Sequence, residues 1–114
     1  MSAITTHVLD TSSGRPATGV PVVLQRRNEG NEWQNVGNGE TDADGRVRTL
    51  MAAGAALEPG IFRLVFDTRR YFDAQGVRSF YPHVIVVFEV LSGETHYHVP
   101  LLVSPFAYTT YRGS

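Results

Sequence analysis

Imidazole and guanidinium groups are the side chains of this sequence best suited to catalysis. The chain has four histidines and no cysteine, and its ten basic residues are all arginines. Thiolate nucleophiles and cysteine metal ligands are therefore excluded, as is Schiff-base chemistry on a lysine. The sequence has neither a serine nucleophile elbow nor a glycine-rich phosphate loop. The histidines, the arginines and the carboxylates remain as candidates for catalysis.

Three histidines lie in segments with the alternating pattern of strands. His7 shares a strand face with Thr5 and Leu9. His96 and His98 are two positions apart, so both point to the same side of their strand. Near neutral pH one imidazole can take a proton from water, while a second holds the substrate or protonates a leaving nitrogen. Such a pair suits the hydrolysis of an activated amide or lactam.

An arginine beside these histidines would complete the site. A guanidinium stabilises a developing oxyanion and can bind a planar anionic ring through two hydrogen bonds. The tight turn at Asp44 and Gly45 fixes where Arg46 emerges, and Arg46 and Arg48 share a strand face. One of these arginines can serve a site while the other is solvated. The surrounding "DADGR" is not a calcium loop, because no acid stands at the last ligand position.

A metal site is the alternative reading of the His-x-His pair. His96 and His98, with a third histidine from elsewhere, could form an open zinc centre that activates water. Against this reading, no carboxylate has an obvious supporting position beside the pair. The residues alone leave both hydrolytic chemistries open.

The elements that must position these groups are short strands. Turn signals separate segments of period two, and the stretch at 68–76 predicts a short helix with Asp67 or Thr68 as its N-cap and Gly76 as its stop. The expected strands are residues 3–10, 20–28, 32–41, 46–50, 60–67, 83–90, 95–103 and 106–112. Seven or eight strands with one helix predict a mainly β, two-sheet β-sandwich that forms a single domain over residues 1–114.

Charge and hydropathy limit the partners. The net charge is −1 and no basic run is present, so neither a nucleic acid nor a polybasic membrane partner is expected. No secretory signal and no apolar run of the ~20 residues that span a bilayer is found, which predicts a soluble, cytoplasmic protein. The strand at 83–90 is apolar on both faces. It is either a central strand or one that also contacts another subunit.

Several stretches together resemble one family. "THVLDTSSGRPATGVPVVL", "TDADGR" and "HYHVPLLVSPFAYTTYRGS" resemble the transthyretin-related proteins, and more narrowly the 5-hydroxyisourate hydrolases. "GIFRLVFDTRRYF" and "FYPHVIVVFEV" extend the resemblance to essentially the whole chain. The final "YRGS" is the most specific stretch, because the transthyretin hormone carriers of the same family do not end this way.

The resemblance implies a transthyretin-like (prealbumin-like) sandwich assembled as a homotetramer, a dimer of dimers, with active sites in the channel between dimers. It implies hydrolytic opening of the lactam ring of 5-hydroxyisourate to 2-oxo-4-hydroxy-4-carboxy-5-ureidoimidazoline, a step of urate degradation in purine metabolism. The family requires no metal and no organic cofactor. A transthyretin-like carrier of a small aromatic ligand is the alternative from another functional class.

The family's site residues carry over position by position. The resemblance assigns catalysis to His7, Arg46 and His98, and substrate binding to Tyr111 and Ser114. It demotes the zinc hypothesis and predicts that residues 111–114 form a wall of the active site rather than a frayed tail. It leaves open which histidine is the general base, and it gives no role to His96 or Arg48.

Overall fold

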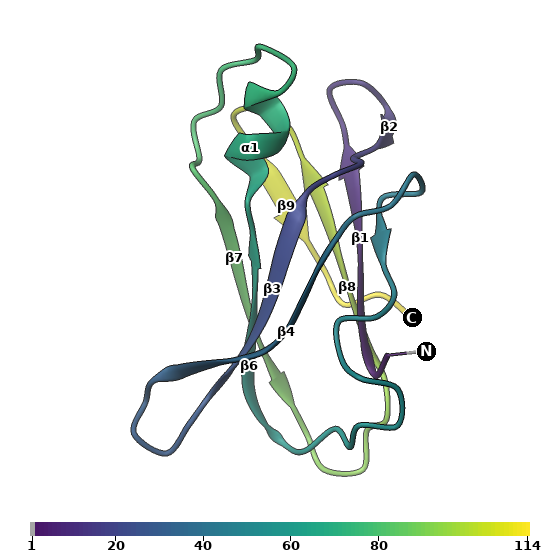
Figure 1. Cartoon of the computed structure of the whole chain (residues 1–114), viewed down its shortest axis with the longest axis vertical. Coiled ribbons are helices and arrows are strands. Elements are labelled where there is room, and N and C mark those ends of the chain that lie inside the picture. The colour runs from purple at the N-terminus through teal and green to yellow at the C-terminus, as the bar shows by residue number, and fades with distance from the viewer. Residues whose placement is uncertain (1) are drawn as a thin grey trace.

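Two β-sheets and one short helix make up the computed structural model, which describes residues 2–114 (Figure 1). Within these residues the elements follow in the order β1 Ile4–Asp10, β2 Arg15–Pro16, β3 Pro21–Arg27, β4 Trp33–Glu40, β5 Arg46–Val47, β6 Gly60–Phe66, α1 Thr68–Asp73, β7 Val84–Val90, β8 Tyr97–Val103 and β9 Tyr108–Thr110. The predicted mainly β sandwich with one short helix is confirmed.

Strands from distant parts of the chain meet in each sheet. The first sheet has the order β2-β1-β8-β9, with β5 also paired to β1, and the second has the order β4-β3-β6-β7. β1 and β8 are parallel, so the two segments that carry most of the histidines run side by side in the same direction. The other strand pairs are antiparallel.

The core lies between the sheets and takes alternate residues from each strand. Ile4 and Val8 of β1 and Leu101 of β8 are fully buried, and they face Leu24 and Leu64 of the second sheet within one apolar cluster. Full burial of one such side chain contributes about 1.5–3 kcal/mol. Because β1 and β8 turn these residues inward, their alternate residues project from the outer face of the first sheet.

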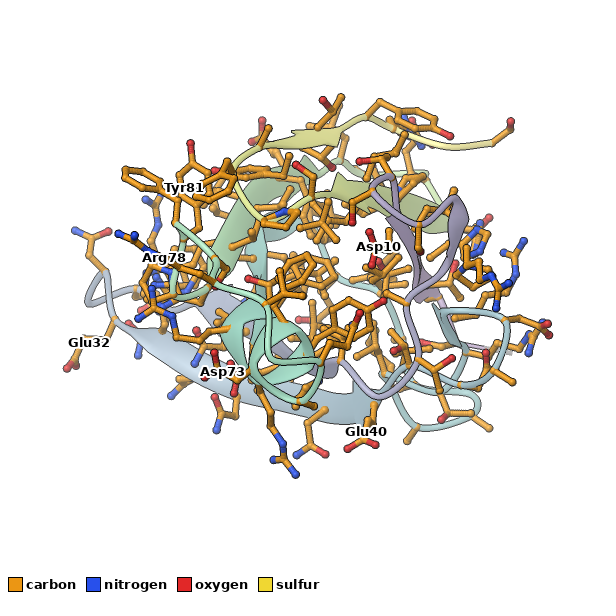
Figure 2. The ribbon with its side chains drawn as sticks, turned by 90° about the horizontal axis from the view of Figure 1, so that it is seen from above. Asp10, Glu32, Glu40, Asp73, Arg78 and Tyr81 are labelled. Carbon is orange, nitrogen blue, oxygen red and sulfur yellow. The ribbon has the colours of Figure 1, made fainter. Side chains whose placement is uncertain are left out.

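Helix α1 is tied to the first sheet by a buried carboxylate. Asp67 caps the helix by accepting the backbone N–H of Arg70, and Tyr71 donates its hydroxyl to Asp10 Oδ2 at 2.7 Å. Burial of Asp10 opposes its ionisation, but hydrogen bonds from Ser12 and Tyr71 outweigh it and lower the pKa of this carboxyl. Figure 2 shows Asp10 directed into the molecule, whereas Glu32 and Glu40 point away from it.

Several predicted boundaries were wrong. The helix ends at Asp73 rather than at 76, although Gly76 does take a positive φ of 69° in the following turn. The strand predicted at 46–50 covers only Arg46–Val47, because β5 pairs only with Thr6 and His7 of β1. The strand predicted to begin at 95 starts at residue 97, and the last one is shortened from 106–112 to 108–110 by the turn before it.

Two further differences concern strand placement. Arg15–Pro16, predicted as a loop, pairs with the end of β1. β7 lies at the edge of its sheet, so the central-strand interpretation of residues 83–90 was wrong. Its inward residues Val84 and Val90 are buried, while Ile85 and Val87 remain exposed. No helix in the described part of the chain is long and apolar enough for a membrane crossing.

Candidate active site

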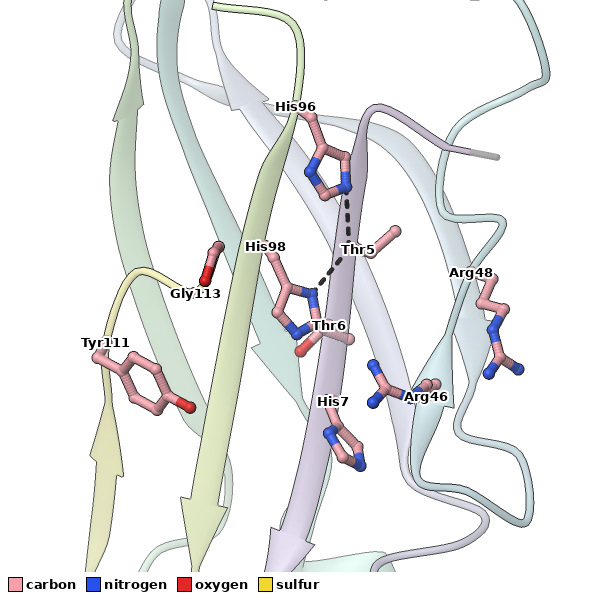
Figure 3. Close-up of a pocket in the computed structure, with 10 residues that line it drawn as sticks. Thr5, Thr6, His7, Arg46, Arg48, His96, His98, Tyr111 and Gly113 are labelled. Carbon is pink, nitrogen blue, oxygen red and sulfur yellow. Dashed lines mark hydrogen bonds between the residues drawn. The ribbon is translucent and has the colours of Figure 1, made fainter.

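A polar pocket of about 470 Å³ opens on the outer face of the first sheet (Figure 3). Its walls come from β1, β5, β8 and the segment after β9. The lining residues are Thr5, Thr6, His7, Arg46, Arg48, His96, His98, Tyr111, Gly113 and Ser114. All five residues predicted to bind or transform a substrate therefore line one pocket, as do the two whose roles were left open.

Strand register explains how the pocket forms. Thr5 lies opposite His98 across the parallel pair β1 and β8. His7, two residues further along the same face of β1, lies opposite Arg46 across the antiparallel pair β1 and β5. Side chains directly opposite one another on one face of a sheet are neighbours. Two different pairings of the same strand thus bring the histidines and the arginine together.

His98 is the most constrained of the imidazoles. Its Nδ1 lies 2.8 Å from Thr5 Oγ1. Burial is the main cause that lowers the pKa of His98, and the positive charge of Arg46 and the neighbouring His7 and His96 lower it further. At neutral pH His98 is therefore held in its uncharged form, in which one ring nitrogen has a free lone pair.

His96 shares a partner with His98. Its Nε2 lies 3.3 Å from the same Thr5 Oγ1, so one hydroxyl contacts both imidazoles. The prediction that His96 and His98 point to the same side of the chain is confirmed. His83, by contrast, is exposed and lies outside the pocket.

The two arginines on the predicted common face have different electrostatic partners. Arg48 forms ion pairs with Asp42 at 2.9 Å and Asp44 at 3.8 Å, whereas no ion pair of Arg46 is found among residues 2–114. Asp42 also accepts the backbone N–H of Arg46, which fixes where this residue leaves the turn. In Figure 3 the Arg46 guanidinium lies on the side of β1 that carries His7, and Arg48 lies further out.

The segment after β9 closes one side of the pocket. The backbone N–H of Gly113 donates to the carbonyl of His98 at 2.8 Å. Arg112 pairs with Glu94 at 3.1 Å and stacks over the ring of Tyr97 at 4.4 Å. These contacts hold residues 111–114 against β8, so the alternative of a frayed polar tail does not describe this segment.

Gly113 approaches His98 more closely than any larger residue could. A Cβ atom at this position would lie 2.6 Å from Cδ2 of the His98 ring and 3.2 Å from Cγ of Pro100. Sequence reasoning missed this contact and the double contact of Thr5. Thr5 had one available signal, its place on the His7 face of the first strand, but nothing local connects residue 113 with residue 98.

The zinc alternative depends on a third ligand beside His96 and His98. Among the residues that the structure describes, no group of three or more histidine, aspartate or glutamate side chains is arranged to hold a metal ion. The observed partner shared by His96 and His98 is the Thr5 hydroxyl.

Comparisons with known proteins agree with the fold. Residues 4–113 match the HIUase/Transthyretin family. The 5-hydroxyisourate hydrolase of Mus musculus is 46% identical over 114 residues, covering 99% of this chain and 96% of that protein. The structure of Klebsiella pneumoniae 5-hydroxyisourate hydrolase superposes with a TM-score of 0.85 and 37% identity, covering 99% of this chain and 100% of that chain. Sea bream transthyretin in complex with thyroxine gives a TM-score of 0.91 with 32% identity, covering 98% and 95%.

Proposed function

The chain belongs to the HIUase/Transthyretin family, and we propose that it is a hydrolase that opens the lactam ring of 5-hydroxyisourate. The product would be 2-oxo-4-hydroxy-4-carboxy-5-ureidoimidazoline, formed in urate degradation. The observation that carries the proposal is the convergence of the imidazoles of His7 and His98, the guanidinium of Arg46, and residues 111, 113 and 114 in one polar pocket. Residues 1–114 would act as one catalytic domain.

Ring opening requires a proton acceptor, a charge stabiliser and a proton donor. His98 accepts a proton from water at a ring nitrogen as the water oxygen attacks the lactam carbonyl carbon. The C–N bond of the tetrahedral intermediate then breaks, and the leaving nitrogen takes up a proton. The base role falls to His98 because burial and the charge of Arg46 lower its pKa and keep it neutral. His7, on the same strand face as Thr5, orients the substrate or protonates the leaving nitrogen.

Arg46 stabilises the negative charge that develops on the carbonyl oxygen. Since no carboxylate pairs with Arg46 in the described residues, its charge is available to a substrate. Loss of one such preorganised group typically costs about 10²–10³-fold in rate. Tyr111 and Ser114 line the same pocket and position the ring through their hydroxyl groups.

We also propose that the reaction needs neither a metal nor an organic cofactor. Histidine, arginine and water can supply each proton and each stabilising charge in the steps above. Treatment with a chelator, followed by its removal, is expected to leave the activity unchanged. A loss of activity that added zinc restores would favour the zinc centre of His96 and His98 instead.

The active assembly would be a homotetramer, a dimer of dimers, with sites in the channel between dimers. β7 and β9 each lie at one edge of their sheet, and Val87, Leu91 and Phe106 are more than half exposed, at 57%, 55% and 63%. Exposed apolar side chains beside unpaired strand edges favour association. Sedimentation equilibrium tests this assembly. The cytoplasmic location expected from the sequence stays a prediction.

A small-ligand carrier is the second candidate, since a transthyretin with bound thyroxine shares the fold. The polar pocket gives such a carrier no evident use for its imidazoles and guanidinium. Binding of an aromatic ligand without turnover of 5-hydroxyisourate would favour this second function.

The test is the ultraviolet decay of 5-hydroxyisourate generated from urate with uricase. Intact protein is expected to outpace spontaneous decay, and removal of residues 111–114 is expected to abolish the acceleration. His98→Asn should lose about 10²–10⁴-fold, the usual contribution of a general base. His83→Asn is the matched control because His83 is exposed and outside the pocket. No acceleration by the intact protein would overturn the proposed function.

A further inference from the structure

One threonine hydroxyl joins two histidines beside the pocket. Thr5 Oγ1 lies 2.8 Å from Nδ1 of His98 and 3.3 Å from Nε2 of His96 (Figure 3). Thr5 itself is buried, with 8% of its surface exposed. A buried hydroxyl held between two ring nitrogens has little freedom to find other partners, so its single proton must be shared between these two contacts.

Two arrangements of protons satisfy both contacts with the Thr5 proton used between the two neutral histidines. A third, in which both rings donate to Thr5, leaves the Thr5 O–H in need of another acceptor, and no further partner of Thr5 Oγ1 is found among residues 2–114. A hydroxyl donates once and accepts from other donors. In the first arrangement, His98 donates its Nδ1–H to Thr5, and Thr5 donates its O–H to Nε2 of His96. In the second, His96 donates to Thr5, and Thr5 donates to Nδ1 of His98. The second places the proton of His98 on Nε2, so that this nitrogen can only donate.

The electrostatic surroundings favour the first arrangement. Figure 3 shows Nδ1 of His98 directed at Thr5 and the other ring nitrogen directed along β1 toward His7 and Arg46. The positive charge of Arg46 acts on this ring. A lone pair on Nε2 is attracted by a nearby guanidinium, whereas an N–H on that nitrogen would direct its own positive end toward it.

His96 can accept a hydrogen bond from the Thr5 hydroxyl without disturbing the catalytic groups. His96 is exposed. Besides the main pocket it lines a second cavity of about 360 Å³, whose walls include Ser2, Ala52 and Thr95. Its remaining ring nitrogen can therefore take or release a proton by exchange with water. Its tautomer is free to follow the needs of Thr5 and His98.

We propose that Thr5 is a positioning residue that holds His98 as its Nδ1–H tautomer, while His96 accepts a hydrogen bond from the Thr5 hydroxyl. The inference deepens the proposed function, on which it rests. Nε2 of His98 is then left with a lone pair that faces the pocket and can accept a proton from the attacking water. The chain His98–Thr5–His96 gives His96 a role that is separate from substrate contact.

The decisive measurement is the tautomer of His98, read from its ring nitrogen shifts in ¹⁵N NMR at a pH where the ring is neutral. The wild-type protein is expected to carry its proton on Nδ1. Thr5→Val removes the acceptor and should shift the population toward Nε2–H, the form that a free neutral histidine prefers. Thr5→Ser retains a hydroxyl and should restore Nδ1–H.

Kinetics provide the second readout. Thr5→Val is expected to lower kcat by about tenfold or more, since a base in the wrong tautomer cannot accept the proton, while KM stays within about threefold. Thr5→Ser should recover most of kcat. Thr11→Val is the control, because the hydroxyl of Thr11, the residue after β1, also donates to β8, at the carbonyl of Val103 and outside the pocket.

Either readout can overturn the proposal. A wild-type His98 that carries its proton on Nε2 refutes it without any variant, and would transfer the base role to His7. A Thr5→Val protein with unchanged tautomer and kcat refutes it as well. If wild-type protein does not hydrolyse 5-hydroxyisourate, the proposed function fails, while the NMR result still decides whether Thr5 sets the tautomer.

Discussion

The contact between Gly113 and His98 leads to a quantitative prediction for Gly113→Ala. An added Cβ would lie 2.6 Å from Cδ2 of the His98 ring, while an ordinary contact begins at 3.4 Å. The ring or the tail must therefore shift by about 0.8 Å, the difference between these two distances. A misplacement of about 1 Å in a catalytic group can cost about 10²-fold in rate. We expect kcat/KM to fall about 10–100-fold, which corresponds to about 1.4–2.7 kcal/mol of transition-state stabilisation.

The stability of the same variant should change little. The added methyl group meets side-chain atoms of His98 and Pro100 rather than backbone, and Gly113 does not require a positive φ. The assay is 5-hydroxyisourate decay alongside thermal unfolding. Gly30→Ala is the control, because an added Cβ there makes only ordinary contacts, with the side chains of Asn28 at 3.4 Å and Glu32 at 3.9 Å. A Gly113→Ala protein within twofold of wild type in kcat/KM would refute the argument that this glycine positions His98.

Three further variants test the arginines of the pocket and the hydrogen bond to Asp10. Arg46→Gln should raise the pKa of His98 toward 6.5 in an NMR titration, whereas an unchanged pKa would contradict the electrostatic coupling. Arg46→Gln should also lower kcat/KM about 10²–10³-fold. Arg48→Gln should keep kcat/KM within about threefold of wild type and change the free energy of unfolding by less than about 1 kcal/mol, because its ion pairs are exposed. A larger loss of kcat/KM would give Arg48 a direct role in the reaction. Tyr71→Phe should lower the free energy of unfolding by about 1–3 kcal/mol at pH 7 in denaturant titrations. The fold lowers the pKa of Asp10 below 3.8, so this stabilisation is present above pH 3.8 and is lost as the pH falls. A difference in unfolding free energy between wild type and Tyr71→Phe that persists undiminished at pH 3 would contradict this account.

The lowered pKa of His98 also makes the free energy of unfolding depend on pH. The folded pKa of His98 lies below its ordinary value of 6.5, so the unfolded chain binds more protons in the window just below pH 6.5. His98 therefore costs no stability above pH 6.5 and destabilises the fold progressively as the pH drops through that window.

The sequence by itself determined the local structure and the chemistry available. Alternation predicted most strands, and Asp67 was one of the two residues predicted as the helix cap, because capping depends on residues within one turn. His96 and His98 were placed on one face by their spacing alone. The absence of cysteine and lysine directed attention to the histidines, the arginines and the carboxylates. The resemblance named five of the ten residues that line the pocket.

Only the tertiary structure decided which of these groups meet. Thr5 contacts two histidines because β1 pairs in parallel with β8 in a register that sets residue 5 opposite residue 98. Gly113 touches His98 because the chain turns at 104–107 and then continues past β9 along β8 in the same antiparallel register. The contact of Thr5 joins residues 93 positions apart. The register of both pairings depends on which faces are buried in the whole sandwich, which no local pattern of residues encodes.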